Sequence, residues 1–360
     1  MRSVAIRFLR IFAGAVLLSG CVHAPPTGAQ PPTMERAITE DGWPIALTHY
    51  PVPDGVAKQP LPVVLCHGLG SNHHSLDLDE GASLARYLAA RGLDVWAIDL
   101  RNHGDSRTRP KDGEKVAEVG FDDYVRKDAP AAVALVRSRT GAPAVLWVGH
   151  SMGGMVGYGL LGRGAPDVAA LVAIASPGSV HEEGLVRFIA GAASVTSVLP
   201  QLHSRALTRM HAAVFGGWVE WHYDNLIYNR VNLSGHERRL LIGTAVDNLT
   251  RAESRQFRGW MKHDTFVSRD GHDDYAANLS KIRVPALLVS GTADRLVPSP
   301  NVQFVMEHLG STDKTHRIFG RSEGDAHDWG HVDLIAGKLA QKEVWPEIGA
   351  WILAHEPGAK

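Results

Sequence analysis

The fold of this chain is decided by the run Ala144-Val145-Leu146-Trp147-Val148 and the pentapeptide that follows it, Gly149-His150-Ser151-Met152-Gly153. The continuous apolar run predicts a strand buried on both faces of a parallel sheet. Residues 152–161 favour a helix. A sharp strand-to-helix turn has room only for small residues two positions before and after Ser151, which accounts for both glycines. The stretch therefore predicts a nucleophilic Ser151 at a helix N-terminus, where the helix dipole favours a developing negative charge.

The same alternation of apolar runs and helical segments extends from about residue 37 to the end of the chain. Helix-like segments include 81–91 and 128–139, and further strands are expected at 61–66, 94–98, 171–175, 286–290 and 316–319. This alternation is typical of an α/β fold with a mostly parallel, doubly wound sheet.

The length and composition are those of a globular protein. A chain of 360 residues with 44% hydrophobic residues can form one large α/β domain with an insertion, or two ordinary domains. Between residues 179 and 278 the periodicity is helical and no good strand is found. We interpret 179–278 as a helical cap inserted into a core formed by 37–178 and 279–360. Its aromatic residues form the cap's own core, a wall over a site, or both.

The charge balance bears on possible partners. The formal net charge is −1, so the chain has no strong field that would recruit nucleic acid or an anionic membrane surface. We therefore expect no nucleic-acid partner.

The N-terminal residues have the features of an export signal. Arg2, Arg7 and Arg10 precede a short apolar run at 11–18, which is too short for a comfortable membrane span. The run ends in Leu18-Ser19-Gly20-Cys21, which resembles a bacterial lipobox whose cysteine is lipidated. An ordinary secretory signal with a chance cysteine is the alternative. Val22, rather than an aspartate, favours outer-membrane sorting by analogy, and residues 22–36 are expected to be a flexible tether.

Cys66 is the other of the two cysteines. If Cys21 is lipidated, no intrachain disulfide is possible. Because Cys66 ends an apolar strand, we expect a buried, unreactive thiol.

A second motif, His67-Gly68-Leu69-Gly70, follows the strand expected at 61–66. Acyl transfer requires N–H donors directed at a tetrahedral oxyanion, and we assign them to the backbones of Leu69 and Met152. We expect the His67 side chain to brace this loop.

A serine nucleophile also needs a base, which a carboxylate in turn orients. Where the nucleophilic serine lies on a strand-to-helix turn of this kind, the three residues follow one another along the chain in the order serine, acid, histidine. Asp294 follows a strong strand and is the preferred acid, with Asp273 and Asp274 as rivals. His331 is the preferred base, with His327 and His316 as rivals.

The spacing of His327 and His331 invites a zinc interpretation, which we reject. Asp328 stands where the zinc motif has a glutamate, and Gly330 weakens the helix that the motif needs. We expect no metal or organic cofactor. The loop 99–106, which contains His103 and Asp105, is interpreted as a structural loop near the site.

These landmarks together resemble the α/β-hydrolase superfamily, from about residue 37 to 355. Within it, 278–285, 330–335 and 342–345 resemble the acid lipases of the gastric and lysosomal kind, which implies ester cleavage under a helical cap. Polyhydroxyalkanoate synthases look similar in the same regions but use a cysteine where this chain has Ser151, which favours hydrolysis.

Three hypotheses follow for the activity. The first is a serine hydrolase that cleaves carboxylic esters of small molecules or lipids through Ser151, His331 and Asp294 and an acyl-enzyme. The second is an acyltransferase with the same triad. The third is a non-catalytic lipid-binding lipoprotein on a hydrolase scaffold, which the intact triad residues disfavour.

Overall fold

The computed structural model describes residues 30–107, 116–179, 201–202, 206 and 226–357. The export signal, Cys21 and most of the first half of the expected cap lie outside these residues. Within the described residues, no helix combines the length and apolar character needed to cross a membrane.

The centre of the molecule is a sheet of eight strands in the order β1-β2-β4-β3-β5-β6-β9-β10. β1 and β2 pair antiparallel with each other, β2 pairs antiparallel with β4, and the remaining pairs are parallel. The strands are β1 (Thr33–Ile38), β2 (Pro44–Tyr50), β3 (Val63–Cys66), β4 (Val95–Ile98), β5 (Val145–His150), β6 (Val168–Ile174), β9 (Ala286–Gly291) and β10 (Lys314–Phe319). A two-stranded ribbon pairs β7 (Gln201–Leu202) with β8 (Leu249–Thr250).

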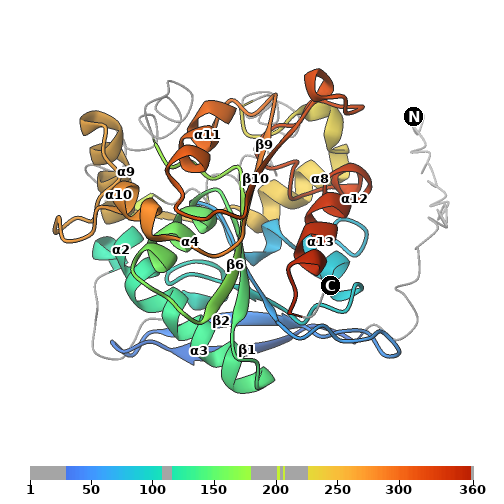
Figure 1. Ribbon diagram of the computed structural model, residues 1–360, viewed down its shortest axis with the longest axis horizontal. Coiled ribbons are helices and arrows are strands. Elements are labelled where there is room, and N and C mark those ends of the chain that lie inside the picture. Colours follow the sequence, from blue (N-terminus) through green and yellow to red (C-terminus); the bar gives the residue numbers. More distant parts are fainter. Residues whose placement is uncertain (1–29, 108–115, 180–200, 203–205, 207–225, 358–360) are drawn as a thin grey trace, which may run out of the picture.

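Helices cover both faces of the sheet, as Figure 1 shows, with α3 and α4 on one side and α13 on the other. The helices of the main fold are α1 (Leu84–Ala89), α2 (Phe121–Asp123), α3 (Ala129–Thr140), α4 (Met152–Gly162), α10 (Tyr275–Asn278), α11 (Ser299–His308), α12 (Lys338–Glu343) and α13 (Trp345–Ala354). Along β3, Val64 belongs to one core cluster and Val63 to the other. This burial on both faces explains the continuous apolar runs, and the predicted fold class is confirmed.

The N-terminal boundary of the core differs from the prediction. β1 begins at Thr33, so residues 33–36 belong to an edge strand and not to a tether. Sequence patterning missed β1 because most of its residues are exposed, and an edge strand of this kind has no apolar run to mark it.

The described part of the expected cap is mostly helical, but the β7–β8 ribbon also falls within 179–278, where the sequence predicts no strand. It contains α8 (Gly235–Leu240), the π-helical turn Leu241–Ala245 and α9 (Arg251–His263). Its role as a cap stays a prediction.

Cys66 ends β3 and is fully buried as a free thiol. Burial raises the pKa of this thiol well above its usual value, so the reactive thiolate is disfavoured.

Candidate active site

Ser151 occupies the sharp turn between β5 and α4. Its backbone has φ 54° and ψ −120°, a conformation that costs a non-glycine residue about 1–3 kcal/mol. The Ser151 N–H donates a hydrogen bond of 2.8 Å to the Ile174 carbonyl at the end of β6. The surrounding sheet therefore holds the turn in its strained form.

The two glycines of the pentapeptide are required by close backbone contacts. A Cβ at Gly149 would lie 2.3 Å from the Gly153 carbonyl carbon, and one at Gly153 would lie 2.2 Å from the Cys66 carbonyl oxygen. Neither position has room for a side chain, so the turn packs directly against the end of β3.

The loop that follows β3 lies beside this turn. A Cβ at Gly68 would lie 3.1 Å from the Ser151 Cβ. His67 accepts a hydrogen bond from the Leu100 N–H at Nε2, so its Nδ1 carries the proton and donates to the Gly68 carbonyl. Burial, with the nearby His103, lowers the pKa of His67 to about 4, which keeps the ring neutral at pH 7. His67 thus braces the loop that carries Leu69.

His331 and Asp294 lie together although they are 37 positions apart. The His331 Nδ1 is 2.8 Å from Asp294 Oδ2, and both residues are buried. Asp294 Oδ1 accepts hydrogen bonds from the N–H groups of Leu296 and Val297. The carboxylate is thereby fixed, and the imidazole that donates from Nδ1 keeps Nε2 as its proton acceptor.

A contact through His150 places this pair beside the Ser151 turn. The His150 and His331 ring centroids are 4.7 Å apart, and His150 Nε2 is 3.1 Å from the His331 carbonyl oxygen. Burial, followed by repulsion from His331, lowers the pKa of His150 well below its usual value. A neutral His150 can donate from Nε2 to that carbonyl without adding charge.

The rival residues are engaged elsewhere. His327 Nδ1 is 2.9 Å from Glu343, and His316 Nε2 is 2.8 Å from the Ser290 hydroxyl. Asp273 binds the guanidinium groups of Arg126 and Arg163, and Asp274 caps α10 by accepting from the Ala277 N–H. His327 and His331 pair with different carboxylates, and neither belongs to a group of metal-binding geometry among the described residues.

The segment around Asn232 holds the His331 loop from outside, a feature that sequence reasoning missed. Buried Asp333 accepts hydrogen bonds from the N–H groups of Gly330 and Asn229 and from the Asn232 side chain. The Asn232 amide also donates to the Asp328 carbonyl, and Val332 donates to the Ile227 carbonyl. Burial raises the pKa of Asp333 to about 6.

Gly330 lies where these two segments touch. A Cβ there would lie 2.7 Å from the Asn229 nitrogen. The glycine that argued against a zinc-binding helix therefore allows this close approach.

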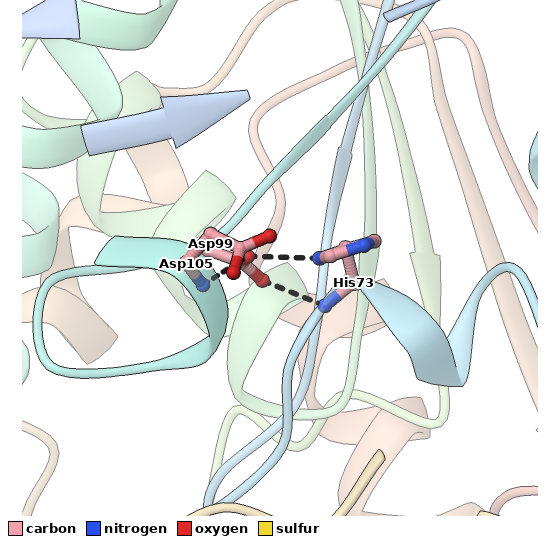
Figure 2. Close-up of side chains that lie close together, drawn as sticks. All are labelled: His73, Asp99 and Asp105. Carbon is pink, nitrogen blue, oxygen red and sulfur yellow. Dashed lines mark hydrogen bonds and ion pairs between the residues drawn. The ribbon is translucent and has the colours of Figure 1, made fainter. Parts of the chain in front are cut away.

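The loop 99–106 is a structural element next to the site. Figure 2 shows the Asp99 carboxylate accepting hydrogen bonds from the ring and the main-chain N–H of His73 and from the Asp105 N–H. Although burial alone would raise the pKa of Asp99, His73 holds it below its usual range. His73, Asp99 and Asp105 form the one cluster of metal-binding geometry in the described residues, and the Asp99 oxygens there already accept protein N–H groups.

Comparisons with known proteins agree with this architecture. Residues 62–335 match the family model described as alpha/beta hydrolase fold. The human lysosomal acid lipase/cholesteryl ester hydrolase is 33% identical over 354 residues, which cover 86% of this chain and 84% of that protein. The human monoglyceride lipase is 28% identical over 291 residues, covering 81% of each chain. Among solved structures, the monoacylglycerol lipase of Paleococcus ferrophilus superposes with a TM-score of 0.56 at 18% identity, covering 87% of this chain and 99% of that one.

Proposed function

The chain belongs to the α/β-hydrolase fold family, and from that premise we propose that it cleaves carboxylic esters through Ser151, His331 and Asp294. The family match and the lipase relatives identify the protein as a carboxylic ester hydrolase. The roles of the individual residues are inferred from the geometry.

In the first half of the proposed reaction the Ser151 hydroxyl attacks the ester carbonyl. His331 Nε2 takes the hydroxyl proton, and Asp294 stabilises the resulting imidazolium through Nδ1. The tetrahedral oxyanion accepts hydrogen bonds from the Leu69 and Met152 N–H groups, neither of which donates to another group within the described part of the chain. The intermediate collapses, the alcohol leaves with the proton from His331, and an acyl-Ser151 ester remains.

In the second half, water attacks the acyl-enzyme. His331 accepts a proton from the water and then returns it to Ser151 as the carboxylic acid leaves. No step uses a metal or an organic cofactor.

The observation that supports this mechanism best is the buried His331–Asp294 pair beside the Ser151 turn. Asp294 is fixed by two main-chain N–H groups, and His331 is fixed by Asp294 and by His150. A base held on both sides is preorganised for proton transfer.

We propose a lipid ester, or another ester with an apolar group, as the substrate. Monoglyceride lipase and lysosomal acid lipase/cholesteryl ester hydrolase are the names of two relatives that match along most of both chains. The helical insertion agrees with an apolar substrate, because an amphipathic cap can bury an acyl chain.

An activity profile across p-nitrophenyl esters from acetyl to palmitoyl, measured for wild type and Ser151→Ala, tests the proposal. We expect the wild type to hydrolyse these esters and Ser151→Ala to lose turnover while melting at a similar temperature. Wild-type rates in Ser151→Ala would refute the assignment, and a preference for acetyl over all longer chains would refute the apolar substrate.

We also propose that Cys21 is lipidated and anchors the enzyme in the bacterial outer membrane, facing the periplasm or the cell surface. The sequence Leu18-Ser19-Gly20-Cys21, which resembles a lipobox, supports the lipidation. Two or more acyl chains on Cys21 would anchor the protein stably. Cell fractionation of the full chain and of Cys21→Ser tests this. The wild type should sediment with outer membranes and the variant should not, whereas equal distribution would contradict the anchor.

A further inference from the structure

The segment Thr244–Leu249, which we call the bracing segment, lies against the loop that follows β3. The Asp247 N–H donates a 2.7 Å hydrogen bond to the Gly70 carbonyl, and Ser71 pairs with Val246 in an antiparallel bridge. The Ser71 hydroxyl also donates to the Ala245 carbonyl. The two segments therefore share a short ladder of main-chain contacts although they are far apart in sequence.

The Asp247 carboxylate joins this ladder to a third loop. Its Oδ2 accepts a 2.7 Å hydrogen bond from the Gly104 N–H, 143 positions away, and a 3.3 Å one from the Asn72 amide. Arg107 supplies a positive charge 3.3 Å from Oδ1, while the Asp247 side chain is fully buried. A buried carboxylate with this many donors holds its surroundings in one geometry.

We propose that Asp247 is a positioning residue for the reaction, acting through the loop that carries Leu69. This inference rests on the proposed function, in which the Leu69 N–H binds the oxyanion. Leu69 lies between two anchored carbonyls, because Gly68 accepts from His67 and Gly70 accepts from the Asp247 N–H. The Asp247 carboxylate fixes the backbone that provides the second anchor.

The close packing around Gly70 also indicates that the bracing segment positions the loop that carries Leu69. Gly70 has φ 61°, and a Cβ there would lie 3.1 Å from Leu249 in the bracing segment. The bracing segment therefore packs closely against the loop at Gly70. A loosened donor weakens binding of the transition-state oxyanion more than binding of the ground-state ester, so kcat should fall with KM little changed.

The test compares wild type, Asp247→Ala, Asp247→Asn and a matched control, Asp273→Ala. Asp273 is also buried in the inserted region and also binds arginine, but its partners are Arg126 and Arg163. Hydrolysis of p-nitrophenyl butyrate is measured well below the lowest melting temperature, and rates are normalised to sites titrated with a fluorophosphonate.

We expect kcat of Asp247→Ala to fall about 10- to 100-fold, less than the loss of a whole oxyanion donor, with KM within about threefold. Asp247→Asn keeps one carbonyl oxygen for Gly104 and should recover part of kcat. Asp273→Ala should lose stability but keep kcat within about twofold.

An active wild type whose Asp247→Ala and Asp247→Asn variants match Asp273→Ala in kcat overturns this inference and leaves the proposed function intact. If Asp247→Ala does not fold, Asp247→Asn decides the question alone. A wild type without ester hydrolysis overturns the proposed function, and this inference with it.

Discussion

The Ser151 turn and the His331 loop are held in place in different ways. The turn is shaped by its own glycines and by β3 and β6, all within the central sheet. The His331 loop is held by Asp294 and by the segment around Asn232, which is 101 positions from Asp333. The nucleophile is thus built by the sheet, whereas the base depends on contacts from the inserted region.

This difference has a functional consequence. Changes at Asn232 or Asp247, the residues of the inserted region that hold the His331 loop and the Leu69 loop, should alter the base or the oxyanion loop without altering the Ser151 turn. Such changes should lower turnover while the Ser151 backbone keeps its strained conformation. The effect of a change on turnover should therefore differ from its effect on stability.

The largest expected effect comes from His331. His331→Ala should lower kcat about 10⁴-fold or more, because the hydroxyl loses its base. His327→Ala should stay within about threefold, since the half-buried His327 pairs with Glu343 and not with Asp294. Steady-state hydrolysis of p-nitrophenyl butyrate measures both, and the reverse ranking would transfer the role of the base to His327.

Asn232→Ala should lower activity much less than His331→Ala does. Losing the amide that binds Asp333 and the Asp328 carbonyl should reduce kcat about tenfold, because a small displacement of the base is costly. Asn301→Ala is the control, since Asn301 is also buried, in α11, and its amide nitrogen has no hydrogen-bond partner among the described residues. Equal kcat in the two variants would contradict the dependence of the base on the inserted region.

The Asp333 carboxyl should also make stability depend on pH. Burial raises its pKa from the usual 3.8 to about 6, so between these values the folded protein holds a proton that the unfolded chain releases. Its contribution to stability is complete below that window and is lost as the pH rises through about 6. The unfolding free energy of the wild type minus that of Asp333→Asn should therefore be larger at pH 4 than at pH 7.5. Urea denaturation measures it, and a difference that grows with pH would contradict the assignment.

The smallest effect concerns the turn itself. Ser151→Gly should be more stable than Ser151→Ala by about 1 kcal/mol, because glycine adopts a positive φ without strain. Thermal and urea denaturation compare the two inactive variants. Equal stability would show that the turn stores no strain.

The sequence predicts the turn well because everything that shapes it is local or belongs to buried strands. The apolar runs that become β3, β5 and β9 are recognisable since both faces of each strand are covered. The sequence does not predict β1, because it lies exposed at the edge of the sheet, or β2, because its apolar run is limited to Ile45-Ala46-Leu47.

The contacts that hold the loops could not be read from the sequence. Asp247 lies in no motif, and the stretch 330–335 that resembles acid lipases does not indicate which residues bind Asp333. The roles of both carboxylates arise only when chain segments more than 100 positions away fold against them. Asp99 lies in a loop that the sequence predicts, but its partner His73 is 26 positions away and no sequence pattern links the two.

The central claim is that Ser151 is a nucleophile activated by His331. It is tested most directly by treating wild type, Ser151→Ala and His331→Ala with a fluorophosphonate and locating the adduct by peptide mass spectrometry. We predict one adduct on Ser151 in the wild type, none in Ser151→Ala, and labelling slowed at least about 100-fold in His331→Ala. An adduct on another residue, or wild-type labelling of His331→Ala, would contradict the account.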